Sequence, residues 1–265
     1  MVPERKVLIR YLYHSGFTVE YGDYFLVFDY FKQNSPMPDI RHEISVHKRP
    51  FVFVSHGHYD HYNPIIFKWK DANPNLRYIV SRDVKVQSQN VRDAGIKNAE
   101  SSCIFMEPYE RIEAGGIAVS AYGSTDIGVS FLLDVNGLRI FHAGDLNWWH
   151  WAEESTAEEL GEEEEKFKNE VSRLERERID ILFFPVDPRL GEYYWLGGGY
   201  MMEKFHPGLF VPMHFADHPG ITRRFAEKMK ETGGRIAEIS RPGQAFEFWG
   251  DGFRAEGSGK DSREK

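Results

Sequence analysis

The chain has 265 residues, 41% of them hydrophobic and 15% aromatic, which is enough apolar material for a sizeable buried core. Its formal net charge of -8 argues against a nucleic-acid partner, because proteins that bind phosphate backbones carry clustered lysine and arginine. Cys103 is the only cysteine, so the sequence excludes an internal disulfide and a zinc site made of cysteines, and it favours a reducing, cytoplasmic location.

The first half of the chain shows short β-patterned runs separated by glycine and other turn residues. No run is long and apolar enough for a signal-peptide core or a membrane span, so we expect no membrane partner. The segment 83–94 has a helical pattern that stops at Gly95. We predict strands at KVLIRYLY (6–13), FTVEY (17–21), YFLVFDY (24–30), FVFVS (51–55) and LRYIVS (76–81).

The second half alternates strands with helices. The segment 153–180 is first acidic and then basic, and it places Phe167, Val171 and Leu174 at helical spacing. We therefore predict an amphipathic surface helix whose charges are solvated, and a further helix at 222–231. Strands are predicted at 116–122, 129–135, 138–145, 180–187, 209–214 and 244–250.

No repeat or linker divides the sequence. Two strand-rich halves with helices between them predict one α/β domain with two packed sheets, which we assign to residues 1–252. Residues 253–265 read as a frayed C-terminal tail.

The residues HGHYDH, 56–61, directly follow a buried strand pattern. A solvated, histidine-rich loop is one interpretation, and a metal site is the other. Alternate residues near a strand end project to the same side, so His56, His58 and Asp60 can converge, and His61 can join them if the chain turns sharply. Imidazole and carboxylate groups are ligands of zinc, iron or manganese, and four of them in six residues favour two adjacent metals.

Two later strand patterns also end in a potential ligand. FHAGD ends in Asp145, and LFVPMH ends in His214. Three buried runs that each end in such residues predict a site along one edge of a sheet sandwich.

These motifs resemble those of the metallo-β-lactamase superfamily of metal-dependent hydrolases. The matching stretches span almost the whole chain in the expected order, and they look most like the branch that includes the ascorbate-6-phosphate lactonase. They are YLYHSGF, VFDY, HGHYDH (56–61), HAGD (142–145), GGGYMM and PMH (212–214).

The resemblance implies an αββα sandwich of two mixed sheets flanked by helices, with the site at one edge. It implies that His56 and His58 bind a first metal and that Asp145 bridges two metals. A metal-bound hydroxide would attack the substrate, and a catalytic Asp60 would orient or deprotonate the water. The implied ligands of the second metal are Asp60, His61 and His214.

One segment departs from the superfamily pattern. The family supplies a third histidine to the first metal from the loop that here reads AYGSTDIGVSF, which has none. Asp126 and Ser124 are the leading substitutes, and His150 stands behind them. We therefore expect one tightly bound and one weakly bound metal.

Four further residues are candidates for substrate binding or for support of the metal ligands. His14 follows the first strand, and Asp29 has the position from which an outer carboxylate could orient a metal-bound histidine. Trp148 and Trp149 follow Asp145 and could wall a pocket or cap the core. The glycines of GGGYMM stand ahead of a predicted helix, where an anion site or a loop with positive φ would explain them.

We therefore expect a metal-dependent hydrolase that cleaves an ester, lactone or phosphoester of a small molecule with one or two divalent ions, zinc first and manganese or iron next. One alternative is a phosphodiesterase of nucleotides or RNA. Another is a non-catalytic protein that binds a metal or a ligand and has an altered first site. The many aromatic residues leave room for a homo-oligomer.

Overall fold

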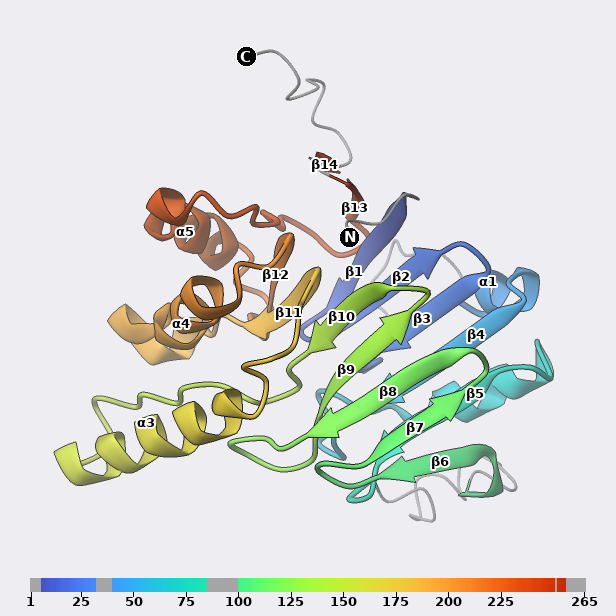
Figure 1. The fold of residues 1–265 in the computed structure, drawn as a ribbon, viewed down its shortest axis with the longest axis horizontal. Helices are drawn as coiled ribbons and strands as arrows, with labels where there is room; N and C mark the ends of the chain where they lie inside the picture. The colour runs from blue at the N-terminus through green and yellow to red at the C-terminus, as the bar shows by residue number, and fades with distance from the viewer. Residues whose placement is uncertain (1–5, 32–39, 85–99, 251, 256–265) are drawn as a thin grey trace.

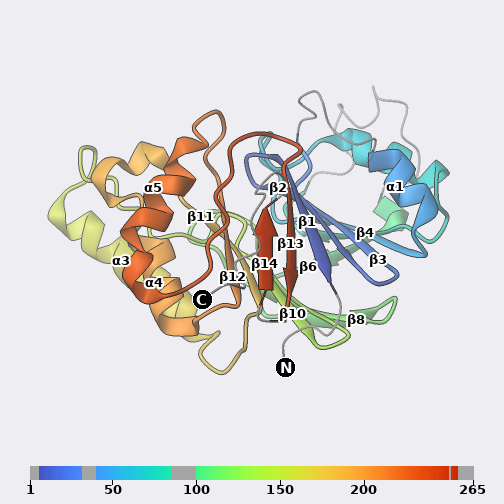
Figure 2. The same cartoon turned by 90° about the horizontal axis from the view of Figure 1, so that it is seen from above.

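The computed structural model describes residues 6–31, 40–84, 100–250 and 252–255. Its elements form four layers, a helix, two facing β-sheets and a group of helices, as Figures 1 and 2 show. The predicted αββα sandwich is thereby confirmed. The helix expected at 83–94 lies outside the described residues except for its first two positions.

The first sheet has eight strands in the order β14-β13-β1-β2-β3-β4-β5-β6. The strands from β13 to β3 pair antiparallel, and those from β3 to β6 pair parallel. Their bounds are β1 Val7–Tyr13, β2 Gly16–Tyr21, β3 Tyr24–Phe28, β4 Arg49–Val54, β5 Arg77–Ser81, β6 Cys103–Met106, β13 Ala245–Trp249 and β14 Gly252–Ala255.

The second sheet has six strands in the order β12-β11-β10-β9-β8-β7. The strands β10, β11 and β12 run parallel, so their carboxyl ends meet at one edge. All residues of β11 and β12 are buried, as expected for strands covered on both faces. Their bounds are β7 Arg111–Ala114, β8 Ile117–Tyr122, β9 Ser130–Val135, β10 Leu138–His142, β11 Ile181–Pro185 and β12 Leu209–Met213.

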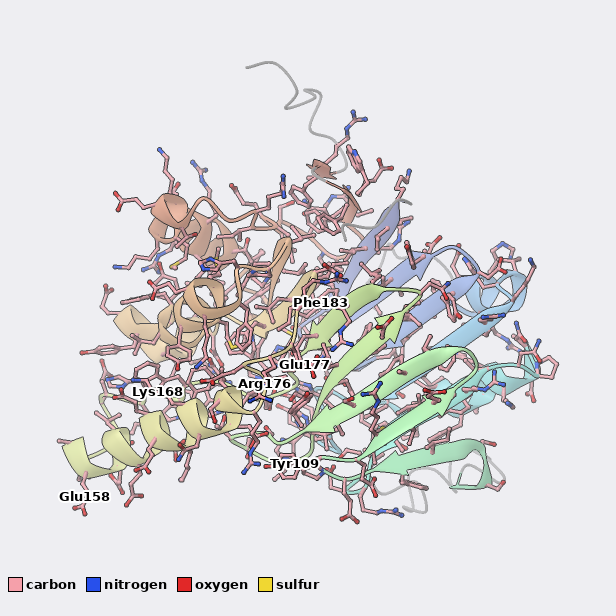
Figure 3. All side chains as sticks on the ribbon, in the orientation of Figure 1. Tyr109, Glu158, Lys168, Arg176, Glu177 and Phe183 are labelled. Carbon is pink, nitrogen blue, oxygen red and sulfur yellow. The ribbon has the colours of Figure 1, made fainter. Side chains whose placement is uncertain are left out.

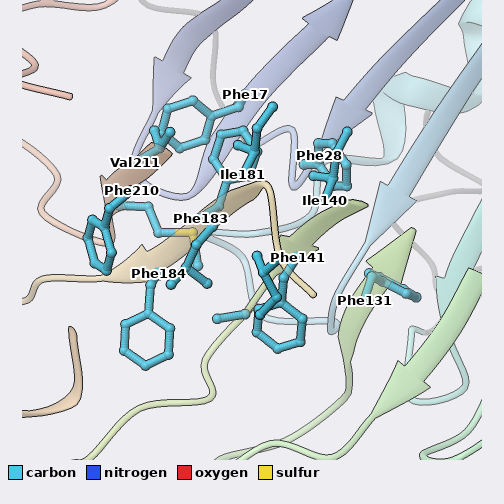
Figure 4. Close-up of a cluster of buried hydrophobic side chains, with 14 of the residues drawn as sticks. Phe17, Phe28, Phe131, Ile140, Phe141, Ile181, Phe183, Phe184, Phe210 and Val211 are labelled. Atoms are coloured by element: carbon cyan, nitrogen blue, oxygen red, sulfur yellow. The ribbon is translucent and has the colours of Figure 1, made fainter. Parts of the chain in front are cut away.

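The main core lies between the two sheets, and Figure 4 shows part of it. Phe17 of the first sheet packs on Phe183 of the second with ring centroids 4.8 Å apart. A smaller core lies on the outer face of the first sheet, under α1 (Ile40–Val46) and the 3-10 helix η1 (Pro64–Asp71). Burial of these two apolar clusters holds the sheets in place and fixes the edge where their loops meet.

The other helices are α4 (Leu196–Phe205) and α5 (Gly220–Lys228), which lie beside the second sheet with α3 (Ala157–Ser172) in Figure 2. Short 3-10 helices occur at Glu100–Ser102, Pro188–Tyr193 and Lys230–Thr232. No helix among the described residues is long and apolar enough to cross a bilayer.

The acidic segment begins its helix α3 with a capping box. Thr156 accepts a hydrogen bond from the backbone N–H of Glu159, and the Glu159 carboxylate accepts one from the backbone of Thr156. Phe167, Val171 and Leu174 are fully buried, as predicted. Figure 3 shows Glu158 at the start of α3 projecting away from the body.

Two parts of the fold differ from expectation. The three glycines of GGGYMM, 197–199, lie inside α4 and not ahead of it. A Cβ at Gly197 would meet the side chain of Asn147, so small residues are needed for close packing rather than for an unusual backbone. The chain also continues past Trp249 into β14, which pairs with β13 where we expected the frayed tail to begin.

Candidate metal centre

The candidate ligands follow the carboxyl ends of strands from both sheets. His14 follows β1 and His56 follows β4 in the first sheet, whereas Asp145 and His214 follow β10 and β12 in the second. The two sheets face each other, so these loops meet at one edge of the sandwich. The site therefore combines short segments that are far apart in the sequence.

Glycines allow these loops to approach one another closely. Gly128 has a φ of +80, and a Cβ there would overlap the Ser55 carbonyl and His56. Gly144 has a φ of +54, and a Cβ there would press on Ser55. Any other residue would force the loops apart, and positive φ would strain it as well.

The carboxylate of Asp145 lies at the centre of the site. Its Oδ1 is 3.1 Å from His61 Nε2 and 3.3 Å from His214 Nε2. Its Oδ2 is 3.3 Å from His56 Nε2. Asp145, His56, His61 and His214 are all buried. Four of the predicted residues are thus in direct contact.

The potential ligand atoms converge in three groups that share members. We call them the inner, the lower and the outer cluster. The family resemblance paired His56 with His58, whose ring centroids lie 4.7 Å apart, and the structure also brings His61 to His56 and His14 to His214. The inner cluster is His56, His61 and Asp145, the lower cluster is His14, Asp60, His61 and His214, and the outer cluster is His58, Asp126 and Asp145.

Two buried aspartates hold the histidines from behind. Asp29 Oδ2 is 2.8 Å from His61 Nδ1, and it also accepts a hydrogen bond from the Ser55 hydroxyl group. Asp187 Oδ2 is 3.0 Å from His214 Nδ1. Asp29 therefore occupies the place predicted for an outer carboxylate. Asp187 was missed, although FFPVD also ends a buried strand in a carboxylate, which is the signal that selected Asp145.

Charges are strongly coupled within the site. Burial opposes ionisation of Asp145, but the adjacent His61 and His214 outweigh it and hold the carboxyl pKa well below its usual range. Burial likewise opposes protonation of His61, yet Asp145 and Asp29 raise its pKa well above the ordinary value, and the pKa of His214 is raised in the same way. Burial and the neighbouring His214 lower the pKa of His14 to about 2. The centre thus attracts positive charge.

Unpartnered buried atoms test whether a metal fits. His56 Nε2, His61 Nε2 and Asp145 Oδ1 are buried without a hydrogen-bond partner among the described residues. When His61 Nδ1 donates to Asp29, neutral His61 turns its Nε2 lone pair toward the Asp145 carboxylate. Two acceptors this close repel unless a proton or a cation lies between them. The donor set of imidazoles and carboxylates suits a divalent transition metal.

The three proposed substitutes for the missing histidine differ in position. Asp126 Oδ2 is 3.9 Å from His58 Nδ1, and both residues belong to the outer cluster. Ser124 instead accepts the backbone N–H of Asp126, and His150 packs on Tyr193 with ring centroids 4.2 Å apart. Neither Ser124 nor His150 joins a ligand cluster among the described residues.

The tryptophans divide into one core residue and two wall residues. Trp148 stacks on Phe167 of α3, so its candidate role in substrate binding is not supported by its position. Trp149 donates to the Asp145 carbonyl and lies edge-on to His214. Trp151 stacks on Trp149 with ring planes 3° apart.

A cavity of about 620 Å³ opens over the cluster. Its cluster side includes His58, Asp60, Asp126 and His214, and Asp60 keeps 30% of its side chain exposed. Part of the cavity wall comes from the charged face of α3, which we had expected to be only solvated. The remaining residues that line the cavity are Thr125, Asp145, Trp149, Trp151, Ser155, Glu159, Glu162, Glu163, Lys166 and Arg189.

Sequence comparisons identify the family of the chain. The family model described as "Beta-lactamase superfamily domain" matches residues 8–214. A protein of Symbiobacterium thermophilum named a metal-dependent hydrolase is 25% identical over 249 residues, which are 90% of this chain and 98% of that one. A protein of Archaeoglobus fulgidus with the same description is 25% identical over 259 residues, covering 91% and 98%.

Solved structures share the fold. A metallo hydrolase of the archaeon Ignicoccus hospitalis superposes with a TM-score of 0.63 at 17% identity, over 92% of this chain and 99% of that one. A diiron beta-hydroxylase of Streptomyces venezuelae gives a TM-score of 0.59 at 13% identity, over 93% of this chain and 54% of that one.

Proposed function

The chain belongs to the beta-lactamase superfamily, and from this premise we propose that it is a metal-dependent hydrolase that cleaves an ester, lactone or phosphoester of a small molecule. The observation that carries the proposal is the cluster around Asp145, where His56 Nε2, His61 Nε2 and Asp145 Oδ1 are buried together without hydrogen-bond partners among the described residues. This cluster opens into a cavity of the size that small ligands occupy.

Two adjacent divalent ions suit the three overlapping clusters. The inner cluster of His56, His61 and Asp145 would hold one ion, with His58 and Asp126 at its open side. The lower cluster would hold the other through His14, Asp60 and His214, because the single free ring nitrogen of His61, Nε2, can bind only one ion. Zinc is the first candidate because imidazole and carboxylate are its usual ligands, and manganese or iron accept the same set.

Bound ions of this kind supply Lewis acidity and a nucleophilic hydroxide near neutral pH. The chain's own residues do the rest. Asp60 lies between the lower cluster and the cavity, so its carboxylate can accept a proton from an attacking water. Burial and the neighbouring His214 lower the pKa of His14, which favours its neutral form, so its ring can bind an ion or accept a hydrogen bond. Trp149 and Trp151 exclude water from one wall.

The cavity wall favours a small substrate over a nucleic acid. Glu159, Glu162 and Glu163 of α3 line the side that faces the cluster. A chain of phosphates that leaves the cluster would meet these carboxylates at close range, which costs binding energy. The phosphodiesterase alternative is therefore restricted to small esters.

Metal content and hydrolysis measured together test the proposal. The protein loaded with zinc, manganese or iron should bind up to about two ions and hydrolyse at least one member of a panel of lactones, esters and phosphodiesters. Asp60→Asn should lower kcat by about 10²–10⁴, and His218→Ala, at an exposed histidine, is the control. A metal-loaded protein that hydrolyses nothing would support the non-catalytic alternative.

A further inference from the structure

Two cations line the cavity, and only one of them is built into the metal centre. Lys166 is a surface residue of α3, with 59% of its side chain exposed, and it pairs with the neighbouring Glu163. Arg189 pairs with Asp187, whose side chain is 1% exposed and whose other contact is the His214 ring. Arg189 is thus linked to the candidate metal ligand His214 through a single side chain, that of Asp187.

The guanidinium of Arg189 has one edge engaged and one edge free. Its Nε lies 3.0 and 2.9 Å from the two Asp187 oxygens, and its Nη2 lies 2.5 Å from Oδ2. The edge formed by Nη1 and the second Nη2 proton has no hydrogen bond among the described residues. With 62% of the side chain exposed at the cavity wall, that edge is accessible to a bound molecule.

The surroundings fix where this edge lies. The Arg189 guanidinium lies over the Trp151 ring, 5.5 Å from its centroid. Trp151 stacks on Trp149, which contacts His214 edge-on. Stacking on one side and the two-point bond to Asp187 on the other leave the guanidinium little freedom to turn away from the cluster.

We propose that Arg189 has two linked roles: it positions His214 through Asp187, and it binds a carboxylate group of the substrate with its free edge. This rests on the proposed hydrolase function and names the substrate class of that same site. A planar carboxylate matches the two parallel N–H groups of the edge. A phosphate also fits this edge, but its second negative charge is repelled more by Glu159, Glu162 and Glu163, which line the same cavity.

Three probes separate the substrate classes. Monomethyl glutarate and methyl pentanoate are the same methyl ester with a terminal carboxylate or a terminal methyl group, and methyl 4-(phosphonooxy)butanoate carries a phosphate instead. Binding to the zinc-loaded protein is measured by calorimetry and hydrolysis by kcat and KM, so the carboxylate can be tested even if turnover is absent. The variants are Arg189→Gln, Arg189→Lys and the control Arg223→Gln, whose arginine pairs with Glu227 on the surface of α5.

In the parent protein the carboxylate probe should bind about tenfold or more tightly than the methyl probe, the usual weight of a hydrogen bond to a charged group. Arg189→Gln should abolish this preference mainly through KM, whereas Arg189→Lys should keep part of it. Zinc titration of the metal-free protein is the independent readout, and Arg189→Gln should weaken the second zinc by up to about tenfold. Arg223→Gln should change neither quantity.

Two results overturn the proposal. If Arg189→Gln keeps both the carboxylate preference and the zinc affinity, Arg189 has neither proposed role. If the parent protein binds the phosphate probe more tightly than the carboxylate probe, the assignment of a carboxylate substrate is wrong. Failure of the hydrolase function looks different, because the carboxylate probe would then bind and respond to Arg189→Gln without being cleaved.

Discussion

His61 and His214 are held by aspartates in opposite ways. Asp29 fixes His61 from the closed side of the site, where its other partners are the backbone and hydroxyl of Ser55. Asp187 fixes His214 but shares its charge with Arg189, which reaches the cavity. The first support is isolated from solvent and substrate, and the second is open to both. If Arg189 binds the substrate as we propose, the His214 half of the centre would respond to a bound ligand and the His61 half would not.

The largest difference between the two halves is expected in the metal content of variants that lack His61 or His214. His61 lies within reach of both the inner and the lower cluster and binds one ion through its free Nε2, so His61→Ala should lose that ion, weaken the neighbouring one and abolish hydrolysis. His214 belongs only to the lower cluster, so His214→Ala should abolish hydrolysis but retain about one ion per chain. Elemental analysis with the His218→Ala control measures this, and equal metal loss in both variants would contradict the grouping.

Replacement of Asp29 or Asp187 should change the free energy of unfolding by different amounts. Asp29→Asn leaves His61 with a weaker partner and disturbs two hydrogen bonds to Ser55, so we expect a loss of about 1.5–3 kcal/mol in the free energy of unfolding. Asp187→Asn should cost less, about 1 kcal/mol, because Arg189 can turn to water. Urea denaturation of the metal-free proteins tests the order, and a larger loss for Asp187→Asn would reverse it.

The pH dependence of metal binding tests both halves at once. The raised pKa values of His61 and His214 favour protonated rings in the metal-free protein. Metal ions must displace these protons, so affinity should rise with pH until it passes the raised pKa values, by about tenfold per pH unit for each proton. Without metal the same shifts stabilise the fold below about pH 6.5 and are lost as the pH rises through the raised values.

Calorimetry in buffers of different ionisation enthalpy counts the released protons. His214→Ala should release about one fewer than the parent protein. An unchanged proton count would show that His214 does not hold a proton in the metal-free state.

The smallest effect is expected at the outer cluster, which lies outside both supported histidines. His58 and Asp126 are each nearly half exposed, so water can replace either as a ligand. Asp126→Ala should therefore weaken the more loosely bound ion by about tenfold or less, while the tighter ion stays. Metal titration with Asp71→Ala, at an exposed aspartate that ends η1, as the matched control detects it, and an equal effect of both variants would argue against Asp126 as the substitute ligand.

Local sequence patterns predicted most of the strands and the residues at their ends, but not β6, β7 or β14. They could not predict which ligands share a cluster, because His61 reaches the inner cluster only after Gly57 and Tyr59 turn the chain. The role of Asp187 depends on its distance to His214, which no pattern within one segment contains. A period of 3.6 residues identified the buried face of α3. The sequence pattern of its charged face is the same whether that face borders solvent or a cavity, so the pattern could not predict the cavity wall.

The glycines of α4 illustrate a second limit on prediction. A glycine triplet suggests a flexible loop, yet Gly197 is in a helix where Asn147 leaves no room for a side chain. Only the packing of α4 against the segment after Asp145 shows this requirement. The strand β14 was missed for a related reason, since its pairing with β13 and not its composition makes it a strand.

The centre draws its side chains from both sheets, His56 and His61 from the first, Asp145 and His214 from the second. Ions bound there would act as a removable cross-link between the two halves of the sandwich. By mass action, free metal at 100 times its dissociation constant adds about 2.7 kcal/mol to stability. The lifetime of the folded chain should then follow the supply of metal: under chelation, proteolysis should begin at the loops of this edge, and it should stop when the ion is restored.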